Sequence, residues 1–591
     1  MNLIGCILLF VLIHLLTCTA EDSNWPSLNF TLETATRSQR DIAKPLPLTQ
    51  GTHVGIALSA LFRNNDYTVD ALSPLYDLLS GGNEALMIDL YWNEFTSQWQ
   101  LCPAPFPSNL TYNPNDVVAL LWGNQDYKCL PGLSTENIMN IVNSYIRDTN
   151  TNIAANYLQI LFNLKSIHYE KSNRTIDLEN MYKPSSINPM NIGNSTLNDT
   201  VASLGSFIFS PTVLEQYQQE SQSGTQEGDG GDSVNSTQAI SYFYNHSDIV
   251  VPPLETVLLV EYKRVLVHVV SNELVNSTRV YQFSDNDRNL IFFDNVIPSY
   301  VDSTSSGSAG EYCQNLITSY SVDGVDVERF NNLSLTTELR YIVDNDETPF
   351  TVDTLSSYIR CGYSAIFNAT YGVGSNSTDE DLLDVVNEFV PHSFWSWAPG
   401  QPADINDTRG GSDNETEENR EGGAFRCVVI TEVGWTVSNC YDKEVVACQN
   451  ASSRNEWVLD NRTKSSYFDA DCGDGLVFGV PRLALEMLSL VMTVRERNVS
   501  FPIWIDVNDL TVDGCYVSGG PYAQCPYQRT ISTNKFIRTV APPVVVAVVV
   551  LVLILIEKIF RSNPIQTNRK RYWKKAIQEY YNKNDFEGVP S

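Results

Sequence analysis

An apolar run near the carboxyl end restricts this chain more than any other feature. Residues 540–556 contain no charged side chain, whereas Arg538 precedes the run and Glu557 and Lys558 follow it. A helix of this length, at ~1.5 Å per residue, extends ~25 Å, which is close to the ~30 Å of a bilayer core once flanking side chains snorkel. A single strand of this length would be unusual. The run therefore predicts one transmembrane helix over 540–556.

The two ends of the chain predict the orientation of this helix. Residues 3–16 are apolar but too short for an ordinary span, and the small residues Cys18 and Ala20 precede a cleavage point, so residues 1–20 are typical of a secretory signal peptide. Residues 557–591 hold eight Lys and Arg against four Asp and Glu. Because basic segments stay in the cytoplasm, this tail is expected to be cytoplasmic and the remainder lumenal or extracellular, a single-pass type I topology.

Candidate N-glycosylation sites lie on one side of the run only. The pattern Asn-x-Ser/Thr, with x other than proline, occurs sixteen times before the run and never after it. Because glycans attach to accessible positions on lumenal or secreted protein, the pattern predicts a glycoprotein. The candidate asparagines are Asn29, Asn109, Asn173, Asn194, Asn198, Asn235, Asn245, Asn276, Asn332, Asn368, Asn376, Asn406, Asn414, Asn450, Asn461 and Asn498.

Charge and cysteine usage limit the compartment and the partners. The chain has 69 Asp and Glu against 38 Lys and Arg, a formal charge of −31, which argues against a nucleic-acid partner. Ten cysteines remain after the signal peptide, an even number that predicts up to five disulfides in an oxidising compartment. The cysteine spacing contains no zinc motif and the chain has only six histidines, so neither a metal nor another cofactor is expected.

The first part of the predicted ectodomain, residues 21–333, alternates strands and helices. Residues 85–92 predict a buried strand, Ser134 is a good N-cap for a following helix, and residues 157–164 and 257–270 are two further apolar stretches. This order favours an α/β domain of TIM-barrel type. The faces of the strand over 85–92 carry Leu86, Ile88 and Leu90 on one side and Met87, Asp89 and Tyr91 on the other.

One segment within this part does not follow the alternation. Residues 219–236 are rich in Ser, Gly, Gln and acidic side chains. Such a composition cannot bury enough apolar surface to order itself, so it predicts a disordered loop.

A short motif in the first part resembles the start of phosphatidylinositol-specific phospholipase C-like phosphodiesterases. Gly51-Thr52-His53 is placed at the end of the first predicted barrel strand and Asp89 lies in the next. The resemblance implies that His53 would be the general base and Asp89 its neighbour. That family has a second histidine, in a His-Gly motif, soon after the second strand, but residues 99–103 contain none. Because one imidazole cannot perform both proton transfers, we interpret the barrel as a phosphodiesterase-like scaffold without catalysis.

The second part, residues 355–530, resembles the disulfide-bearing α+β fold of C-type lectins. Residues 394–402 (FWSWAPGQP), together with three later cysteines, are similar to the second half of that fold, and they imply a disulfide between Cys427 and Cys440. Residues 472–486 and 504–517 are similar to its first half. Because the halves occur in reverse order, the region is either a circularly permuted domain or two partial copies that pack together.

Calcium-dependent sugar binding in that fold needs oxygen ligands that this sequence supplies only in part. The pair Gln401-Pro402 is not followed directly by the required side chain, and Trp435 is followed by Thr436, which lacks a carboxylate. Trp395 and Trp397 are interpreted as core residues rather than as a platform for a sugar.

Four stretches together resemble the fungal maintenance of telomere capping protein 6 family. They are residues 37–41 (RSQRD), 86–93 (LMIDLYWN), 394–402 (FWSWAPGQP) and 519–527 (GGPYAQCPY). The resemblance covers nearly the whole chain and implies a type I membrane glycoprotein with a barrel-like lumenal domain. The family name implies a link to telomere capping, which a lumenal domain would make indirect.

The leading hypothesis is a membrane glycoprotein of the secretory pathway that is not an enzyme. Its ectodomain would serve binding or assembly, with a protein or glycan ligand that the sequence does not identify. Two alternatives remain. One is a lumenal phosphodiesterase that uses His53 and Asp89 on a lipid or glycolipid, and the other is a lectin-like receptor for glycans.

Overall fold

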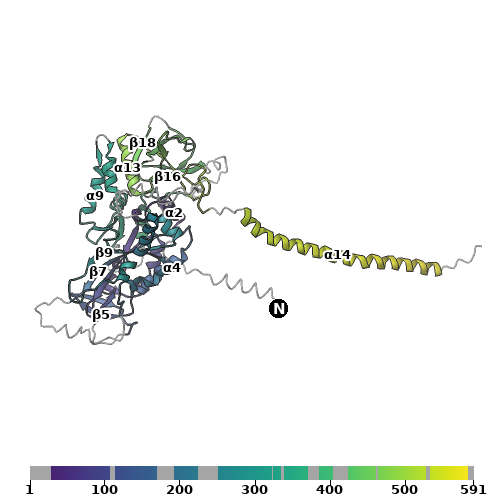
Figure 1. Ribbon diagram of the computed structural model, residues 1–591, viewed down its shortest axis with the longest axis horizontal. Helices are drawn as coiled ribbons and strands as arrows, with labels where there is room; N and C mark the ends of the chain where they lie inside the picture. The colour runs from purple at the N-terminus through teal and green to yellow at the C-terminus, as the bar shows by residue number, and fades with distance from the viewer. Residues whose placement is uncertain are drawn as a thin grey trace, which may run out of the picture. The chain divides into compact units, whose positions relative to one another are not determined.

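The computed structural model divides the chain into two units, Met1–Cys525 and Pro526–Ser591 (Figure 1). It describes residues 28–106, 113–168, 192–223, 251–321, 324–334, 338–369, 385–403, 424–450, 452–460, 464–527 and 533–583. The predicted signal peptide lies outside these residues, as does 224–236 of the predicted disordered loop. The predicted start of that loop at 219 is wrong, because helix α6 (Pro211–Ser223) continues past it.

A sheet of nine strands, counted over the described residues, forms the centre of the first unit. Its neighbouring strands are parallel, except that β4 (Gln98–Gln100) pairs antiparallel with β3. This arrangement confirms the predicted α/β class. In spatial order the other strands are β10 (Ser299–Ser303), β13 (Leu339–Val343), β14 (Ser364–Phe367), β1 (Val54–Ala57), β3 (Ala85–Asn93), β7 (Leu158–Ile167), β9 (Val265–Glu273) and β8 (Ile208–Phe209).

Side chains of this sheet alternate between two cores. On β3, Leu86 and Ile88 lie in the core that the helices cover, whereas Met87 lies in a second core with side chains of β7, β9, β13 and β14. Across this second core the Tyr341 hydroxyl of β13 donates to Gln159 Oε1 of β7 at 2.8 Å. Because β13 and β7 are not neighbours in the sheet, the sheet must curve around the second core, as part of a barrel.

Helices follow the strands along the chain and cover the outer core. The helix predicted after Ser134 is α4 (Thr135–Asp148), where the Ser134 backbone N–H donates to Asn137 Oδ1 at 2.9 Å and Ile138 and Val142 are buried. The stretch 257–270 is not one element, because a π-helical turn (Thr256–Val260) precedes β9. The other helices here are α2 (Phe30–Ala43), α3 (Leu75–Ser80), α8 (Asp285–Leu290), α9 (Ser308–Ile317), α10 (Val327–Ser334) and α11 (Val352–Arg360).

The barrel extends beyond residue 333, so the boundary predicted from the sequence is wrong. Strands β13 and β14 follow that point, and β14 pairs with β1 through Val54 and Ala365, Gly55 and Ile366, and Ile56 and Phe367. The second region therefore begins after β14 rather than at residue 355. The prediction failed because two four-residue strands far apart in the sequence carry no local sign that they pair.

The second region contains a sheet of six strands, within the described residues, and the helix α13 (Ala484–Glu496). Strand β20 (Ile503–Asn508) lies between β15 (Phe425–Ile430) and β17 (Val445–Asn450). Segments that resemble opposite halves of a lectin domain thus share one sheet. The lectin resemblance and the choice between a permuted domain and two packed copies stay predictions. The remaining strands are β16 (Trp435–Asn439), β18 (Ser453–Leu459) and β19 (Leu476–Phe478).

Five disulfides join the ten cysteines that follow the predicted signal peptide, which confirms the predicted maximum. Cys427 is bonded to Cys440, the pair that the lectin resemblance implied. The other bonds are Cys102–Cys129, Cys313–Cys361, Cys448–Cys472 and Cys515–Cys525.

Helix α2 joins the barrel to the second region, between which it lies in Figure 1. The indole N–H of buried Trp397 donates to Ser38 Oγ at 2.8 Å, and Arg37 donates to a backbone carbonyl beyond β20 at 2.8 Å. On the barrel side, Arg40 donates to backbone carbonyls in the loop 152–155 that precedes β7. Residues 37–41 (RSQRD) therefore have a structural role, because side chains of this motif contact both the barrel and the second region.

The second unit contains one long helix, α14 (Thr533–Lys583), which covers residues 540–556 and most of the predicted tail. The structure thus confirms a helix over the predicted span. Among the residues described here, however, no helix combines the length and the apolar character that crossing a membrane requires. The membrane crossing itself stays a prediction.

We expect Ser38→Ala to weaken the joint between barrel and second region. The substitution leaves the buried Trp397 N–H without an acceptor, which should lower the free energy of unfolding by ~1–3 kcal/mol in urea titrations. Ser144→Ala is the control, because Ser144 is exposed on α4 and its loss should change stability by less than ~0.5 kcal/mol. Equal effects of both substitutions would contradict the assigned role of Ser38.

Candidate functional site

His53 lies at the amino end of the barrel strands, not at the carboxyl end of the first strand. The predicted position is wrong, because β1 begins at Val54, directly after this histidine. Its Nδ1 lies 2.8 Å from Glu84 Oε2, and its backbone N–H donates to Ser364 Oγ at 3.0 Å. The imidazole is 9% exposed. His53 is thus held among residues that begin three adjacent strands.

Asp89 lies near the opposite end of the barrel. The pairing of Gly55 with Ala85 places His53 level with Asn83. Asp89 lies six residues beyond Asn83 along the direction of the strands. At ~3.3 Å per residue this separates the two side chains by ~20 Å along the strands. The structure therefore does not bring the two predicted phosphodiesterase residues together.

The partners of Asp89 come from β7. Its Oδ1 accepts from Asn163 Nδ2 at 3.0 Å, and its Oδ2 lies 2.8 Å from Lys165 Nζ. The Lys165 ammonium also lies 5.8 Å from the centre of the Tyr91 ring. Asp89 and Lys165 are both partly exposed, so this cluster forms a polar surface at the carboxyl end of the strands, where TIM barrels bind their ligands.

Aromatic residues complete this surface, which we call the barrel mouth. Tyr67 belongs to β2 (Asp66–Tyr67) and Tyr127 to β6 (Gln125–Cys129), and their rings are 6.3 Å apart. These strands form a small sheet with β5 (Val118–Trp122), seen at the opposite end of the unit from α13 in Figure 1. Burial, and next the charge of Asp89, raise the pKa of Tyr67 and of Tyr91, so both hydroxyls stay protonated as hydrogen-bond donors.

The mouth presents groups that can bind a ligand. Asp89 accepts one hydrogen bond on each carboxylate oxygen, and the raised pKa values keep the Tyr67 and Tyr91 hydroxyls protonated near neutral pH. Phenolic hydroxyls, an amide and ring faces are the groups that bind polar, hydroxyl-bearing ligands.

Two residues of this mouth were not predicted from the sequence. Asn163 and Lys165 stand two positions apart at the end of an otherwise apolar stretch, with the same parity as Leu161, which faces the inner core. Polar residues with inward parity at a strand end were the signal that could have identified them.

A further histidine lies inside the barrel. His268 of β9 is fully buried, and its Nε2 lies 3.6 Å from Asp294 Oδ1. Burial lowers the pKa of His268, although Asp294 and a backbone hydrogen bond of Ile297 oppose that effect, so the imidazole is neutral near pH 7. The neutral ring is enclosed in the core of the barrel.

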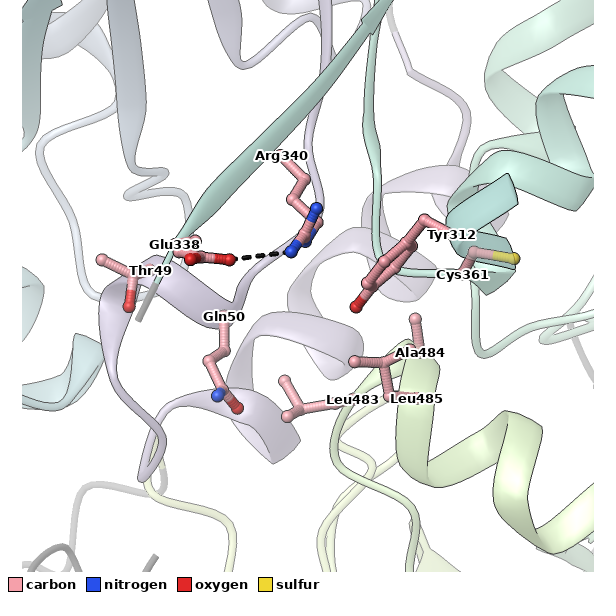
Figure 2. A pocket seen from close by; sticks show the side chains of 10 residues that line it. Thr49, Gln50, Tyr312, Glu338, Arg340, Cys361, Leu483, Ala484 and Leu485 are labelled. Atoms are coloured by element: carbon pink, nitrogen blue, oxygen red, sulfur yellow. Dashed lines mark hydrogen bonds and ion pairs between the residues drawn. The ribbon is translucent and has the colours of Figure 1, made fainter. Parts of the chain in front are cut away.

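The small cavity at the amino end of the barrel strands is too small for an organic ligand (Figure 2). Its volume is about 30 Å³, the space of roughly one water molecule. Glu338 and Arg340 pair at 2.7 Å on one wall, and Leu483 and Ala484 at the start of α13 form another. The second region therefore covers this end of the barrel beside β1, β13 and β14.

The residues that would form a lectin-type calcium site are engaged within the protein. Gln401 Oε1 accepts from the backbone N–H of Ala403 at 3.1 Å and of Val437 at 3.2 Å. Trp395 and Trp397 are 4% and 1% exposed, which confirms that they are core residues. No group of three His, Cys, Asp or Glu side chains suited to a metal occurs in the part of the chain that is described.

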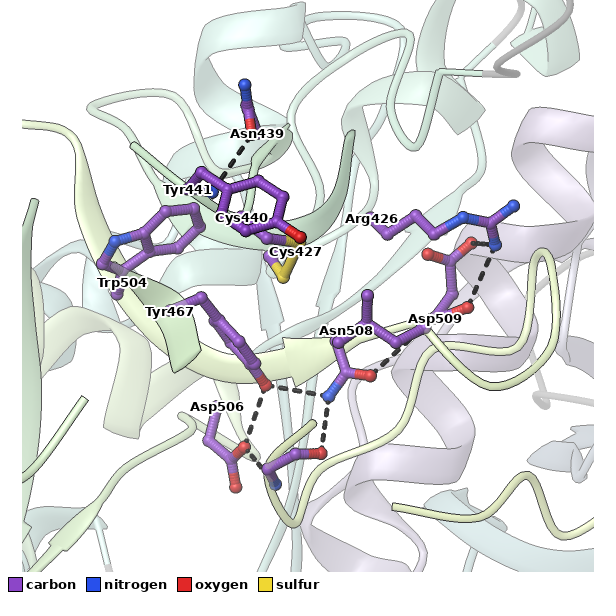
Figure 3. Close-up of a disulfide and its surroundings, with 12 residues drawn as sticks. Arg426, Cys427, Asn439, Cys440, Tyr441, Tyr467, Trp504, Asp506, Asn508 and Asp509 are labelled. Atoms are coloured by element: carbon purple, nitrogen blue, oxygen red, sulfur yellow. Dashed lines mark hydrogen bonds and ion pairs between the residues drawn. A yellow bond between two sulfur atoms is a disulfide. The ribbon is translucent and has the colours of Figure 1, made fainter. Parts of the chain in front are cut away.

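The acidic residues at the end of β20 stabilise the surroundings of the Cys427–Cys440 disulfide (Figure 3). Asp506 accepts from the Tyr467 hydroxyl and from the backbone of Gly519 and Gly520. Asp509 accepts from the Gly514 N–H at 3.0 Å and is 1% exposed. Burial raises the pKa of Asp509 to about 6, although the Gly514 hydrogen bond and the Arg426 charge oppose the rise.

Half of the sixteen candidate glycosylation sites lie among the described residues, and none of these eight is buried. They are exposed or half-buried, as glycan attachment requires. Whether they carry glycans stays a prediction. The eight are Asn29, Asn194, Asn198, Asn276, Asn332, Asn368, Asn450 and Asn498.

Comparisons with known proteins identify relatives over the full length. A model of the MTC6 partial TIM-barrel domain matches residues 26–390. Maintenance of telomere capping protein 6 of Candida tropicalis is 66% identical over 100% of both chains, and that of Candida albicans SC5314 is 53% identical over 96% of both. The protein of the same name in Komagataella phaffii is 27% identical over 98% of this chain and 99% of its own.

We expect the stability of the Asp509→Asn variant, relative to the wild-type chain, to increase as pH rises. The pKa of Asp509 is raised in the folded protein, so the wild-type chain loses stability as pH rises from its unfolded pKa of ~3.9 through its folded pKa of about 6, whereas asparagine does not titrate. Between pH 4.5 and pH 7.5, the free energy of unfolding of the variant relative to wild type should rise by ~2 kcal/mol in urea titrations.

Ser144→Ala, the exposed substitution on α4, is the control for this titration, because it removes no ionisable group. Its effect on stability should be the same at pH 4.5 and pH 7.5. A pH dependence for Ser144→Ala equal to that of Asp509→Asn would contradict the assignment.

Proposed function

Because the chain belongs to the maintenance of telomere capping protein 6 family, we propose that it is a single-pass type I membrane glycoprotein whose ectodomain binds or assembles rather than catalyses. Its part in telomere capping, the process named in its relatives, is then indirect, since the ectodomain and the chromosome ends lie on opposite sides of a membrane. The observation that carries the proposal is the barrel mouth, where Asp89 is engaged by Lys165 and Asn163.

The geometry supports binding over phosphodiester cleavage. Acid–base cleavage needs two proton-transfer groups within hydrogen-bond reach of the reacting atoms. Asp89 has an ammonium and an amide as partners, His53 lies ~20 Å away along the strands, and His268 is enclosed in the core. The barrel mouth nevertheless keeps partly exposed polar and aromatic groups, which suit recognition of a hydroxyl-bearing ligand such as a glycan.

Exposed apolar side chains on α14 support the membrane anchor. Every residue of 548–556 is between 42% and 60% exposed within the chain. Since consecutive residues point in all directions around a helix, this segment is apolar on every face, a pattern that water does not favour. The candidate glycosylation sites precede it and the basic tail follows it, as type I topology requires.

Endoglycosidase treatment of the full-length protein from its native membrane tests the topology. We expect a large gain in electrophoretic mobility, and a carboxyl-terminal epitope that protease digests in sealed vesicles while the ectodomain is protected. Substituting the eight described asparagines by glutamine should remove part of the mobility change. Unchanged mobility of the wild-type chain would refute the proposed topology.

Turnover assays on inositol phospholipid and on an inositol glycolipid test the absence of catalysis. Full-length protein, Asp89→Asn and His53→Ala should all release phosphoinositol at the rate of the buffer blank. Substrate cleavage by the wild-type chain that Asp89→Asn abolishes would establish the phosphodiesterase alternative instead. Cleavage that persists equally in both variants would indicate a contaminating enzyme.

A further inference from the structure

A groove of about 530 Å³ lies where the barrel meets the second region. It is bounded by α11 of the barrel, by α13, by the segment 391–399 and by the turn 432–434 between β15 and β16. Its volume is within the range of sites for small organic ligands. The groove is separate from the barrel mouth, since none of its lining residues belongs to a strand of the barrel.

The floor of the groove is apolar. Trp395 and Met487 are 4% and 6% exposed, and Leu488 and Val491 are half-buried beside them. On α13 the residues 487, 488 and 491 have the spacing that places side chains on one face of a helix. Leu488 and Val491 are thus the floor residues whose aliphatic side chains are most accessible to a ligand.

Two arginines stand at the edge of this floor. Arg360 ends α11 and Arg495 lies in the last turn of α13. Both side chains line the groove, and both residues are exposed. Partial desolvation, and next the charge of Arg495, lower the pKa of Arg360. Neither pairs with a carboxylate in the described part of the chain, whereas Arg340, Arg426 and Arg454 all do.

Asp353, His392 and Glu432 also line the groove, and among the residues described none of them forms an ion pair with Arg360 or Arg495. Within the same residues, the hydrogen bond of Arg360 is a long one, 3.4 Å, to the backbone carbonyl of Val433. Two guanidinium groups with free donors beside an apolar floor form an asymmetric site, cationic at one side and apolar at the other.

We propose that this groove binds an amphiphilic anion. An aromatic or aliphatic body packs on Leu488 and Val491, and a phosphate or carboxylate accepts hydrogen bonds from Arg360 and Arg495. Planar guanidinium groups form paired, charge-assisted hydrogen bonds with either anion. The bound anion also relieves the repulsion between the two cations. This binding requires neither the membrane anchor nor the barrel mouth.

Calorimetric titration of the full-length protein in phosphatidylcholine nanodiscs tests the site, with empty nanodiscs as the blank. The probes are 1-naphthyl phosphate and 1-naphthoate, with uncharged 1-naphthol as the reference. We expect both anions to bind more tightly than naphthol, and the double substitution Arg360→Gln and Arg495→Gln to weaken anion binding ~tenfold or more. Naphthol affinity should change less than ~twofold, because its ring contacts remain. The anion that binds with the higher affinity identifies whether the site prefers a phosphate or a carboxylate.

Two further variants make the outcome decisive. Arg497→Gln removes an exposed charge just beyond α13 that does not line the groove, so its affinities should match wild type. Val491→Trp fills the groove and should abolish binding of all three probes. If the double variant does not fold, Arg495→Gln alone must weaken anion binding at least ~threefold. Absence of anion binding to wild type, or equal affinities in wild type and the arginine variants, would overturn the proposal.

Discussion

The parallel pairing of β3 with β7 is the constraint on which the rest of the barrel depends. Nine consecutive residues of each strand, 85–93 and 159–167, stand opposite one another without a shift. Because side chains alternate along a strand, a slip of one residue would exchange the inner and outer faces of both strands. The register therefore keeps the aliphatic residues toward the helices and places Asn163 directly opposite Asp89, where their side chains meet.

The junction between the barrel and the second region covers one end of the barrel and also borders the groove. Helix α2 bonds to both regions, and the start of α13 covers the amino end of β1, β13 and β14. The same contact of α13 with the barrel leaves the groove between α11 and α13 at the border. Direct contacts thus hold the barrel and the second region together. The barrel mouth and the groove are two separate surfaces of this unit.

Local patterns in the sequence predicted local structure well and distant pairing poorly. The alternation in 85–92 reports burial directly, so the two faces of β3 were predicted correctly, and the N-cap at Ser134 predicted the start of α4. The end of the barrel at which His53 lies was predicted wrongly. It depends on the residue at which β1 begins, and the residues around His53 do not indicate that residue. The barrel mouth was found only in part, because Lys165 and Asn163 gain their meaning from the strand beside them.

The late pairing of β14 with β1 has a consequence for biosynthesis. The partner of Val54 is Ala365, so one edge of β1 stays open while about 310 further residues are made, or for ~15–60 s at ordinary rates of translation. An unpaired strand edge is a template for wrong association. The nascent chain must therefore be shielded through this interval by its own early helices or by chaperones, and its yield should be sensitive to the folding capacity of the compartment in which it is made.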